Sequence, residues 1–308
     1  MNPAVKPPEQ VFIVGCGDIG RRVARLWQAE GIPVTGLVRN GGRLTATGIP
    51  AYLADLDDPA SLSDLPVNQA LVYYFAPPPQ HGQDDPRMAH FLQALDQQGS
   101  RPQRIVYIST SGVYGDRQGE IVSEDTAPNP QVDRARRRYA AEQALREWGR
   151  QHAVPVIVLR VGGIYGPDRL PIKRLREQVP MVHEALAPQT NRIHAADLAA
   201  ICVAAARRGT ADAIYNVSDG NDSNMTQYFN TVADFLGLPR PPLIDRDEAQ
   251  QTLSEGMLSY LGESRRMDTS RLREELGIQL QYPTLQEGLE ATCQRDRDEL
   301  RGTRDEGR

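Results

Sequence analysis

The chain has 308 residues and a formal net charge of −5 at pH 7, which suits one large α/β domain with a smaller lobe and lacks the basic face of a nucleic-acid-binding protein. No stretch reaches the roughly 18 apolar residues of a membrane span, so neither a nucleic acid nor a membrane is an expected partner. Three widely separated cysteines suggest neither a disulfide framework nor a metal site, so we expect a cytoplasmic protein without a bound metal.

The first elements form one unit over residues 11–39: a strand, a glycine-rich turn, an amphipathic helix and a second strand. Gly15 permits the tight turn, Gly17 lets the backbone approach a pyrophosphate, and Gly20 allows the helix to pack closely on the strand. The helix N-terminus offers N–H donors and a partial positive charge to phosphates. The pattern predicts a dinucleotide site, and a glycine-rich turn that binds nothing is the alternative. The predicted cofactor contacts here are Gly15, Gly17, Asp18, Ile19 and Gly20.

The second strand ends at Arg39, where NAD-binding proteins carry a carboxylate for the ribose 2′-hydroxyl. A guanidinium attracts a 2′-phosphate that a carboxylate would repel, and Asn40 and Arg43 lie close in sequence. We therefore expect NADP(H), with Arg39 and Asn40 among its contacts. NAD(H) is the alternative, with Arg39 as an ordinary solvated charge.

Further strands are predicted at residues 50–53, 70–75, 104–109, 156–161 and 213–217. Helical patterns lie between most of them, and this alternation predicts an α/β fold with a Rossmann-type, doubly wound parallel sheet and a small C-terminal substrate-binding lobe. We assign residues 10–165 to the dinucleotide-binding core. Residues 166–295 form a mixed segment with the remaining sheet strand or strands and the lobe, and residues 296–308 form a polar tail.

Ligands of such sheets bind beyond the carboxyl ends of the strands. The residues at these places are Asp55, Ala76, Thr110, Ser111, Gly163 and Tyr165. The segment after them carries the basic residues Arg169, Lys173, Arg174, Arg176 and Arg192. These charges would suit a phosphate-bearing or carboxylated substrate, and a solvated basic helix is the alternative. We interpret Asp197 as a structural cap of a helix N-terminus.

Short motifs occur in a fixed order: Gly15 to Gly20, Asp55-Leu56, and residues 109–115, 160–167, 192–198 and 215–218. In this order they resemble the extended and atypical short-chain dehydrogenases/reductases, which include the NAD-dependent epimerase/dehydratase group. The resemblance covers residues 11 to about 240. It implies hydride transfer between a nicotinamide and a sugar-like or small carbonyl or hydroxyl substrate, phosphorylated or nucleotide-linked. It also implies a homodimer through the helices at residues 86–98 and 132–152. Further cofactor contacts implied by the resemblance are Asp55, Leu56, Ala76, Arg138 and Gly163.

The chain departs from this family at the catalytic pair Tyr-x-x-x-Lys, because neither of its lysines, Lys6 and Lys173, follows a tyrosine by four residues. Aligning the family's next residues on 140–142 puts Arg134 at the tyrosine's place and Arg138 at the lysine's place. Arg134 stays protonated near neutral pH and cannot cycle a proton. Two hypotheses follow: an NAD(P)-dependent oxidoreductase or epimerase/dehydratase with a non-standard active site, and a non-catalytic dinucleotide-binding sensor or partner-binding protein.

The resemblance places Thr110 where the family has a substrate-binding hydroxyl, with Ser111 as its neighbour if the alignment slips by one residue. The alternative for both is an ordinary hydroxyl that closes a strand. A catalytic protein would need a new proton donor, and the candidates are Tyr165, Tyr114 and His194. Each of the three is alternatively a packing residue.

Overall fold

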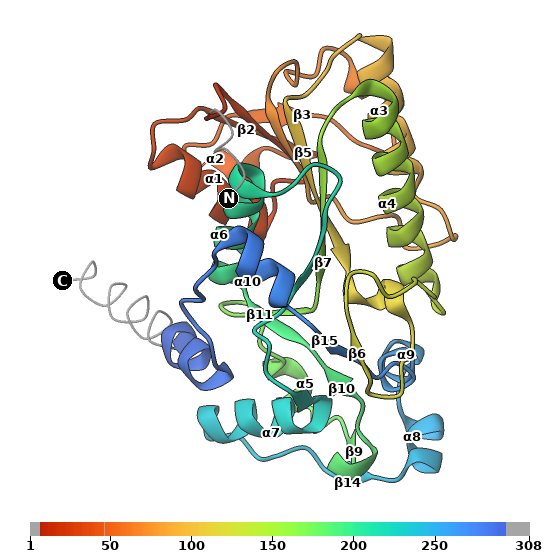
Figure 1. The fold of residues 1–308 in the computed structure, drawn as a ribbon. Coiled ribbons are helices and arrows are strands. Elements are labelled where there is room, and N and C mark those ends of the chain that lie inside the picture. The colour runs from red at the N-terminus through yellow and green to blue at the C-terminus, as the bar shows by residue number, and fades with distance from the viewer. Residues whose placement is uncertain (1–6, 46, 294–308) are drawn as a thin grey trace, which may run out of the picture.

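Seven parallel strands form the central sheet of the computed structural model, which describes residues 7–45 and 47–293 (Figure 1). They are β1 (Val11–Val14), β2 (Val34–Val38), β3 (Ala51–Leu53), β4 (Leu71–Tyr74), β5 (Arg104–Thr110), β7 (Val156–Val161) and β12 (Ile214–Val217). Their order across the sheet is β12-β7-β5-β4-β1-β2-β3, and every neighbouring pair is parallel. The predicted strands are all present, and the Rossmann-type fold is confirmed.

Helices cover both faces of this sheet (Figure 1). One layer holds α1 (Asp18–Gln28), α6 (Ala195–Arg208) and α10 (Ser270–Leu276), and the other holds α3 (Pro86–Gln97) and α4 (Asp133–His152). Side chains of β1 alternate between the layers, because Ile13 belongs to the apolar cluster of Trp27 and Phe12 belongs to that of Phe91. The predicted helices at 86–98 and 132–152 therefore stand on the same face of the sheet.

The other elements are α2 (Gly42–Thr45), η1 (Pro59–Leu62), η2 (Ser111–Tyr114), β6 (Ile121–Val122), β8 (Gly163–Tyr165), α5 (Ile172–Arg176), β9 (Met181–Val182), η3 (Glu184–Leu186), β10 (Gln189–Thr190), β11 (Arg192–His194), β13 (Ser223–Asn224), α7 (Met225–Leu236), β14 (Leu243–Ile244), α8 (Arg246–Thr252), α9 (Glu255–Leu261) and β15 (Arg266–Met267). Most of them build a smaller lobe beside the carboxyl ends of the strands (Figure 1). Its separate apolar core draws on α5, β9, α7, β14, α8 and α9. The lobe and strand β12 both fall within the assigned segment 166–295, whereas residues 294–308, with the polar tail, lie outside the described residues.

The chain returns from the lobe to the sheet through β15, which pairs in parallel with β6 just after η2. Beyond β15, α10 packs on α6 and β12. Residues 259–265 are thereby brought beside the end of β5, although more than a hundred residues separate them in sequence. Within the described residues, no helix combines the length and the apolar character needed to cross a membrane.

A buried ion pair joins α4 to β7. Arg160 donates from Nη2 to Glu142 Oε1 at 2.5 Å and from Nε to Glu142 Oε2 at 3.3 Å, and Ser109 Oγ donates to the same Oε2 at 3.0 Å. The Arg160 guanidinium also lies over the Tyr114 ring, 4.9 Å from its centroid. Both charged residues are at most 2% exposed, so this cluster fixes α4 against the strands that lead into the site.

Candidate functional site

The glycine-rich turn between β1 and α1 has the geometry that the predicted glycine roles require. Gly15 has φ of +81°, and a Cβ there would lie 2.5 Å from the backbone nitrogen of Ala76. A Cβ at Gly20 would lie 3.1 Å from Ile13 Cγ2, which shows how closely α1 packs on β1. A Cβ at Gly17 would meet nothing within 4 Å, so the turn leaves open space where the helix N-terminus presents its N–H groups.

Asp18, in the first turn of α1, holds two arginines. Its carboxylate accepts from Arg22 Nε at 2.9 Å and from Arg169 Nε at 2.7 Å. Burial alone would raise the pKa of Asp18, but the hydrogen bonds and charges of Arg169 and Arg22 outweigh it and hold the pKa below its usual value. Arg169 comes from the loop after β8, so this ion pair links the glycine-rich turn to the loop beside the substrate lobe.

Arg39 and Asn40 are exposed directly after β2. Asn40 Oδ1 accepts a hydrogen bond from the backbone nitrogen of Gly42 at 2.9 Å, which orders the entry into α2. The nearby Asp57 accepts from Arg87 through both carboxylate oxygens, at 2.7 and 2.6 Å. These hydrogen bonds are the main cause of the lowered pKa of Asp57, and the charge of Arg39 lowers this pKa further. Arg39 therefore lies in solvent at the edge of the turn, free to approach a ligand there.

Asp55, Leu56 and Ala76, the predicted cofactor contacts after β3 and β4, differ in their hydrogen bonds and burial. Asp55 Oδ1 accepts from the backbone nitrogen of Asp57 at 3.0 Å, while the Leu56 side chain is buried in the core on the α3 side of the sheet. Ala76 packs against Gly15, and its carbonyl oxygen accepts from Arg138 Nη1 at 3.3 Å. Because the carbonyl oxygen of Leu56 also contacts His90 Nδ1 at 2.7 Å, neither this oxygen nor the side chain is left for a ligand.

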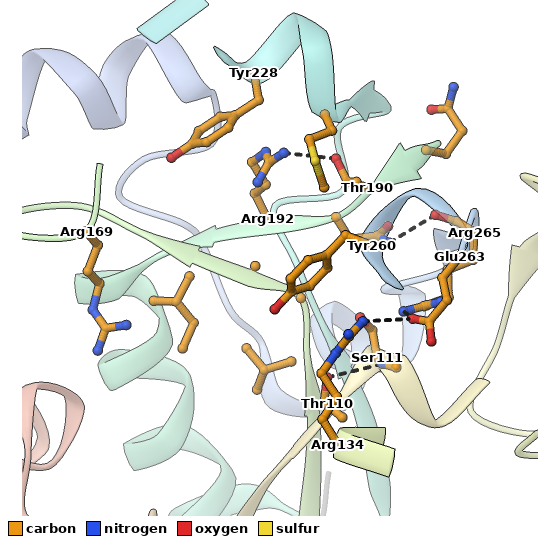
Figure 2. Close-up of a pocket in the computed structure, with 18 of the residues that line it drawn as sticks. Thr110, Ser111, Arg134, Arg169, Thr190, Arg192, Tyr228, Tyr260, Glu263 and Arg265 are labelled. Carbon is orange, nitrogen blue, oxygen red and sulfur yellow. Dashed lines mark hydrogen bonds and ion pairs between the residues drawn. The ribbon is translucent and has the colours of Figure 1, made fainter. Parts of the chain in front are cut away.

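A cavity of about 710 Å³ opens beyond β5 and β7, between the sheet and the lobe (Figure 2). Its wall includes Thr110, Ser111 and Gly163 of the predicted site. It is strongly basic, because six arginines and one carboxylate, Glu263, line it. The arginines are Arg134, Arg138, Arg169, Arg174, Arg192 and Arg265.

Arg134 and Arg138, one helical turn apart on α4, both face this cavity but are held differently. Arg138 Nη1 donates to the carbonyl oxygen of Ile108 at 3.0 Å, as well as to Ala76. The Arg134 guanidinium stacks on the Tyr260 ring, 4.1 Å from its centroid, and pairs with Glu263 at 3.6 Å. Glu263 also accepts from Arg265 Nη2 at 3.0 Å. Arg134 is thus tied to the C-terminal segment, whereas Arg138 is fixed against the ends of the sheet strands.

Thr110 and Ser111 end β5 and begin η2. Thr110 Oγ1 accepts from the backbone nitrogen of Gly112 at 3.1 Å and so caps η2, while its hydroxyl hydrogen is left for a ligand in the cavity. Ser111 is buried but contributes to the cavity wall. Both hydroxyl candidates therefore lie beside Arg134 in the same wall (Figure 2).

The three predicted proton donors lie behind the cavity wall. Tyr165 is 1% exposed, and its hydroxyl donates to the Thr284 carbonyl oxygen at 3.4 Å. Tyr114 is fully buried and donates to Asn216 Oδ1 at 2.7 Å. His194 caps α6, because its Nδ1 accepts from Ala196 at 3.2 Å, and burial lowers its pKa to about 4. These contacts favour the packing interpretation for all three.

Two other expectations need correction. Of the basic residues after β8, Arg169, Arg174 and Arg192 line the cavity, whereas Lys173 and Arg176 are exposed on α5 outside its wall. Asp197 does not cap its own helix, a role that His194 takes. Its carboxylate accepts instead from the backbone nitrogens of Gln281 and Tyr282, at 2.7 and 3.0 Å, and so holds the C-terminal segment.

Sequence reasoning missed the cavity residues Thr190, Tyr228, Tyr260, Glu263 and Arg265. They come from the lobe and from the segment before β15, where no glycine motif or regular pattern marks them. The predicted alignment of Arg134 with the family's tyrosine gave the only signal, because a charge at that place needs a partner and Arg134 pairs with Glu263.

The sheet order, the glycine-rich turn and the cavity beyond the strand ends define a dinucleotide-type Rossmann fold with a substrate lobe. The sequence profile of the NAD dependent epimerase/dehydratase family matches residues 11–218, and the chain belongs to this family. Over 294 residues, which are 89% of this chain and 97% of the relative, it is 28% identical to Protein YeeZ of Escherichia coli K12.

Two solved structures share the whole fold. A functionally unknown conserved protein from Silicibacter pomeroyi superposes with a TM-score of 0.78 at 28% identity, covering 92% of this chain and 98% of that one. UDP-glucose 4-epimerase from Thermus thermophilus, in complex with NAD, superposes with a TM-score of 0.72 at 21% identity, covering 92% and 97%. The second likeness concerns the fold alone.

Proposed function

We propose that this protein binds a nicotinamide dinucleotide and transfers hydride between it and a carbinol or carbonyl carbon of a small, sugar-like substrate. The turn at Gly15–Gly20 carries this proposal, because it leaves open space at Gly17 in front of the α1 N-terminus and on the same edge of the sheet as the cavity. Membership of the NAD dependent epimerase/dehydratase family supports the nicotinamide cofactor, as does the NAD in the complex of the Thermus thermophilus epimerase.

NADP(H) is the proposed form of the cofactor, with Arg39 and Asn40 at its 2′-phosphate. Arg39 is exposed beside the turn, where its guanidinium can bind a phosphate with two hydrogen bonds. Bound there, the cofactor would supply or accept the hydride. Arg138, fixed against the ends of β4 and β5, would hydrogen-bond the ribose hydroxyls, and Gly163 would allow the nicotinamide to approach the cavity.

Thr110, with Ser111 beside it, is the proposed hydroxyl that binds the reacting oxygen of the substrate. We assign proton transfer to Tyr260, which replaces the buried candidates Tyr165, Tyr114 and His194 in this role. Tyr260 is 47% exposed and lines the cavity wall with Thr110, and Figure 2 shows its hydroxyl directed into the open space. The Arg134 guanidinium stacks on its ring, 4.1 Å from the centroid, and so holds the ring in the cavity wall.

The cofactor proposal is tested by titrating the protein with NADPH and NADH and following the fluorescence of Trp27 and Trp148. Arg39→Asp should weaken NADPH binding about tenfold or more and leave NADH binding little changed. Arg25→Asp, the same charge change at the exposed far end of α1, is the control. Equal affinity of the wild type for both cofactors would refute the NADP(H) preference, and binding of neither would refute the function.

A second candidate function is a dinucleotide-binding sensor or partner-binding protein without turnover. It is favoured by the replacement of the family's tyrosine with Arg134, whose charge is paired with Glu263. A screen of carbonyl substrates with NADPH, including phosphorylated and nucleotide-linked sugars, separates the two functions. Oxidation of NADPH by any of them supports the enzyme, whereas tight binding without turnover across the panel supports the sensor.

The proposed setting is a cytoplasmic homodimer. Cys16 and Cys202 are buried thiols that form no disulfide, which suits the proposed reducing compartment. The dimer is proposed to form through α3 and α4, which lie side by side on one face of the sheet (Figure 1).

A further inference from the structure

Arg192, at the start of β11, is a partly buried arginine in the cavity wall. Its guanidinium lies 3.6 Å from the centroid of the Tyr228 ring, and Nη2 donates to Thr190 Oγ1 at 3.1 Å (Figure 2). Nε has no hydrogen-bond partner in the described part of the chain. Arg192 therefore makes one side-chain hydrogen bond, although a guanidinium has five N–H donors.

No carboxylate of the described residues forms an ion pair with Arg192. Asp219 acts on it through its charge, but that carboxylate accepts from the backbone nitrogen of Asn221 at 2.9 Å. Burial lowers the pKa of Arg192 to about 10, which reflects a cation held in an environment that disfavours its charge. A buried charge without an ionic partner destabilises a folded protein, and an anion from outside would remove that cost.

Three of the other five arginines in the cavity wall have a carboxylate partner. Arg134 and Arg265 share Glu263, and Arg169 is paired with Asp18. Arg174 is exposed on α5 and donates to Met257 Sδ at 3.1 Å, and Arg138 donates to the carbonyl oxygens of Ile108 and Ala76. Arg192 thus differs in combining a partly buried position in the cavity wall, a buried Nε without a hydrogen-bond partner and no ion pair among the described residues.

The position of Arg192 also shows where an anion would bind. A Cβ built on Gly163 would lie 3.3 Å from Arg192 Nη1, so this nitrogen lies beside the first residue of β8. Gly163 is the residue expected beside the nicotinamide, and Thr110 belongs to the same cavity wall. An anion on Arg192 would therefore lie at the reacting end of the cavity.

We propose that Arg192 binds an oxyanionic group of the substrate, a carboxylate or a phosphate, beside Gly163. The placement at the reacting end rests on the proposed function. A neutral sugar would leave the guanidinium unpaired, so the substrate class is a hydroxy or oxo compound that carries its own anion close to the reacting carbon.

The first test is the stability of the protein without any substrate. Arg192→Met removes the buried charge and keeps the apolar stem over Tyr228, so its Tm should rise by about 3 °C. Arg176→Met removes the same charge from an exposed position on α5 and should leave Tm within about 1 °C of the wild type. A lower Tm for Arg192→Met would show that the guanidinium is a structural group and would overturn the proposal.

The second test measures the response to small anions. Wild type, Arg192→Met and Arg176→Met are melted in millimolar malonate, inorganic phosphate or chloride at equal ionic strength. Malonate or phosphate should raise the Tm of wild type and Arg176→Met above the value in chloride, and Arg192→Met should need about tenfold more anion for the same rise. Stabilisation by malonate alone identifies a carboxylate, and stabilisation by phosphate alone identifies a phosphate. An equal response of Arg192→Met and wild type, or no response of the wild type beyond chloride, would overturn the proposal.

NADPH titration of the same three proteins separates this proposal from the proposed function. If NADPH binds to all three and the wild type shows no specific anion response, the anion site alone is refuted. If NADPH does not bind and Arg192 still mediates anion stabilisation, the oxyanion site stands while the hydride-transfer function fails.

Discussion

The sequence alignment predicts Arg134 and Arg138 at the two positions of the family's catalytic pair, and the structure gives them different contacts. Arg138 donates to the carbonyl oxygens of Ile108 and Ala76, so it keeps a cation fixed at the ends of β5 and β4. Arg134 is bound to Glu263 and to the Tyr260 ring. The proton-transfer group that Arg134 cannot supply is thus placed, by our proposal, on a side chain that stacks on it.

Tyr260→Phe tests this assignment with the substrate found in the NADPH screen. Removing the hydroxyl should lower kcat about 100-fold or more and leave NADPH affinity unchanged, because the ring and its contact with Arg134 remain. Tyr282→Phe, which removes a hydroxyl away from the cavity wall, should keep wild-type kcat. A Tyr260→Phe enzyme with full kcat would exclude Tyr260 as the proton donor.

His194 should make stability depend on pH. Burial and the Arg22 charge lower its pKa from 6.5 to about 4, so between these values the unfolded chain binds a proton that the folded chain does not. The free energy of unfolding should therefore fall as the pH is lowered from about 6.5 to 4, by on the order of 3 kcal/mol from this group. Urea unfolding across this pH range measures it.

His194→Asn provides the matched variant, because asparagine can still cap α6 without titrating. It should be less stable at pH 7, having lost the ring contacts with Tyr165 and Tyr282, but its unfolding free energy should fall less steeply towards pH 4. His183→Asn, at an exposed position, should keep the wild-type slope. Parallel pH curves for wild type and His194→Asn would contradict the assignment.

At the scale of elements, the Glu142–Arg160 pair joins α4 to β7 inside the protein. Glu142→Gln leaves the Arg160 charge buried without its partner, so it should lower the free energy of unfolding by about 3–5 kcal/mol. The double variant Glu142→Met with Arg160→Met should recover much of this loss, because it removes both buried charges and keeps similar side-chain volumes. Chemical denaturation of both variants provides the comparison, and a double variant no more stable than Glu142→Gln would contradict it.

The strands of the sheet were predictable because each is a short apolar run between turns, buried by helices on both faces. The helices α3 and α4 were predictable for a similar reason, since each shows a long pattern with clear ends. The pairs β15–β6 and β8–β11 were not, because each has only two or three residues and depends on contacts between distant parts of the chain. Tyr260 and Glu263 are brought to the cavity by the β15–β6 pairing, so the local sequence could not place them.

The same reason explains the errors at the strand ends. Tyr165 follows β7 as the strand-end rule requires, but β8 pairs with β11 and turns the ring into the lobe, against His194. The rule that ligands bind beyond the strand ends predicts where the chain leaves the sheet. The pairing of β8 with β11 then determines which side chain reaches the cavity. Gly163, two residues earlier on β8, remains in the cavity wall.

At the scale of the whole molecule, the proposed dimer depends on the outer surface of α3 and α4. The large exposed apolar side chains of the described residues lie on other elements: Leu26, Leu53, Ile121, Leu186, Leu243 and Tyr260. The exposed positions on α4 are mainly polar, with Gln143, Glu147 and Arg150 beside Ala144. A dimer through this face would bury polar surface, so we expect it to be weak and sensitive to salt.

Sedimentation velocity over a range of protein concentrations tests this expectation. The wild type should change from monomer to dimer in the micromolar range at low salt and move towards monomer as salt increases. Ala144→Arg places a bulky charge at the centre of the face and should hold the protein as a monomer. Leu186→Arg, with the same added charge on η3 of the lobe, should behave as the wild type does. A wild type that stays monomeric throughout, or a dimer that Ala144→Arg leaves intact, would rule out the proposed interface, because Ala144 is an exposed position on α4.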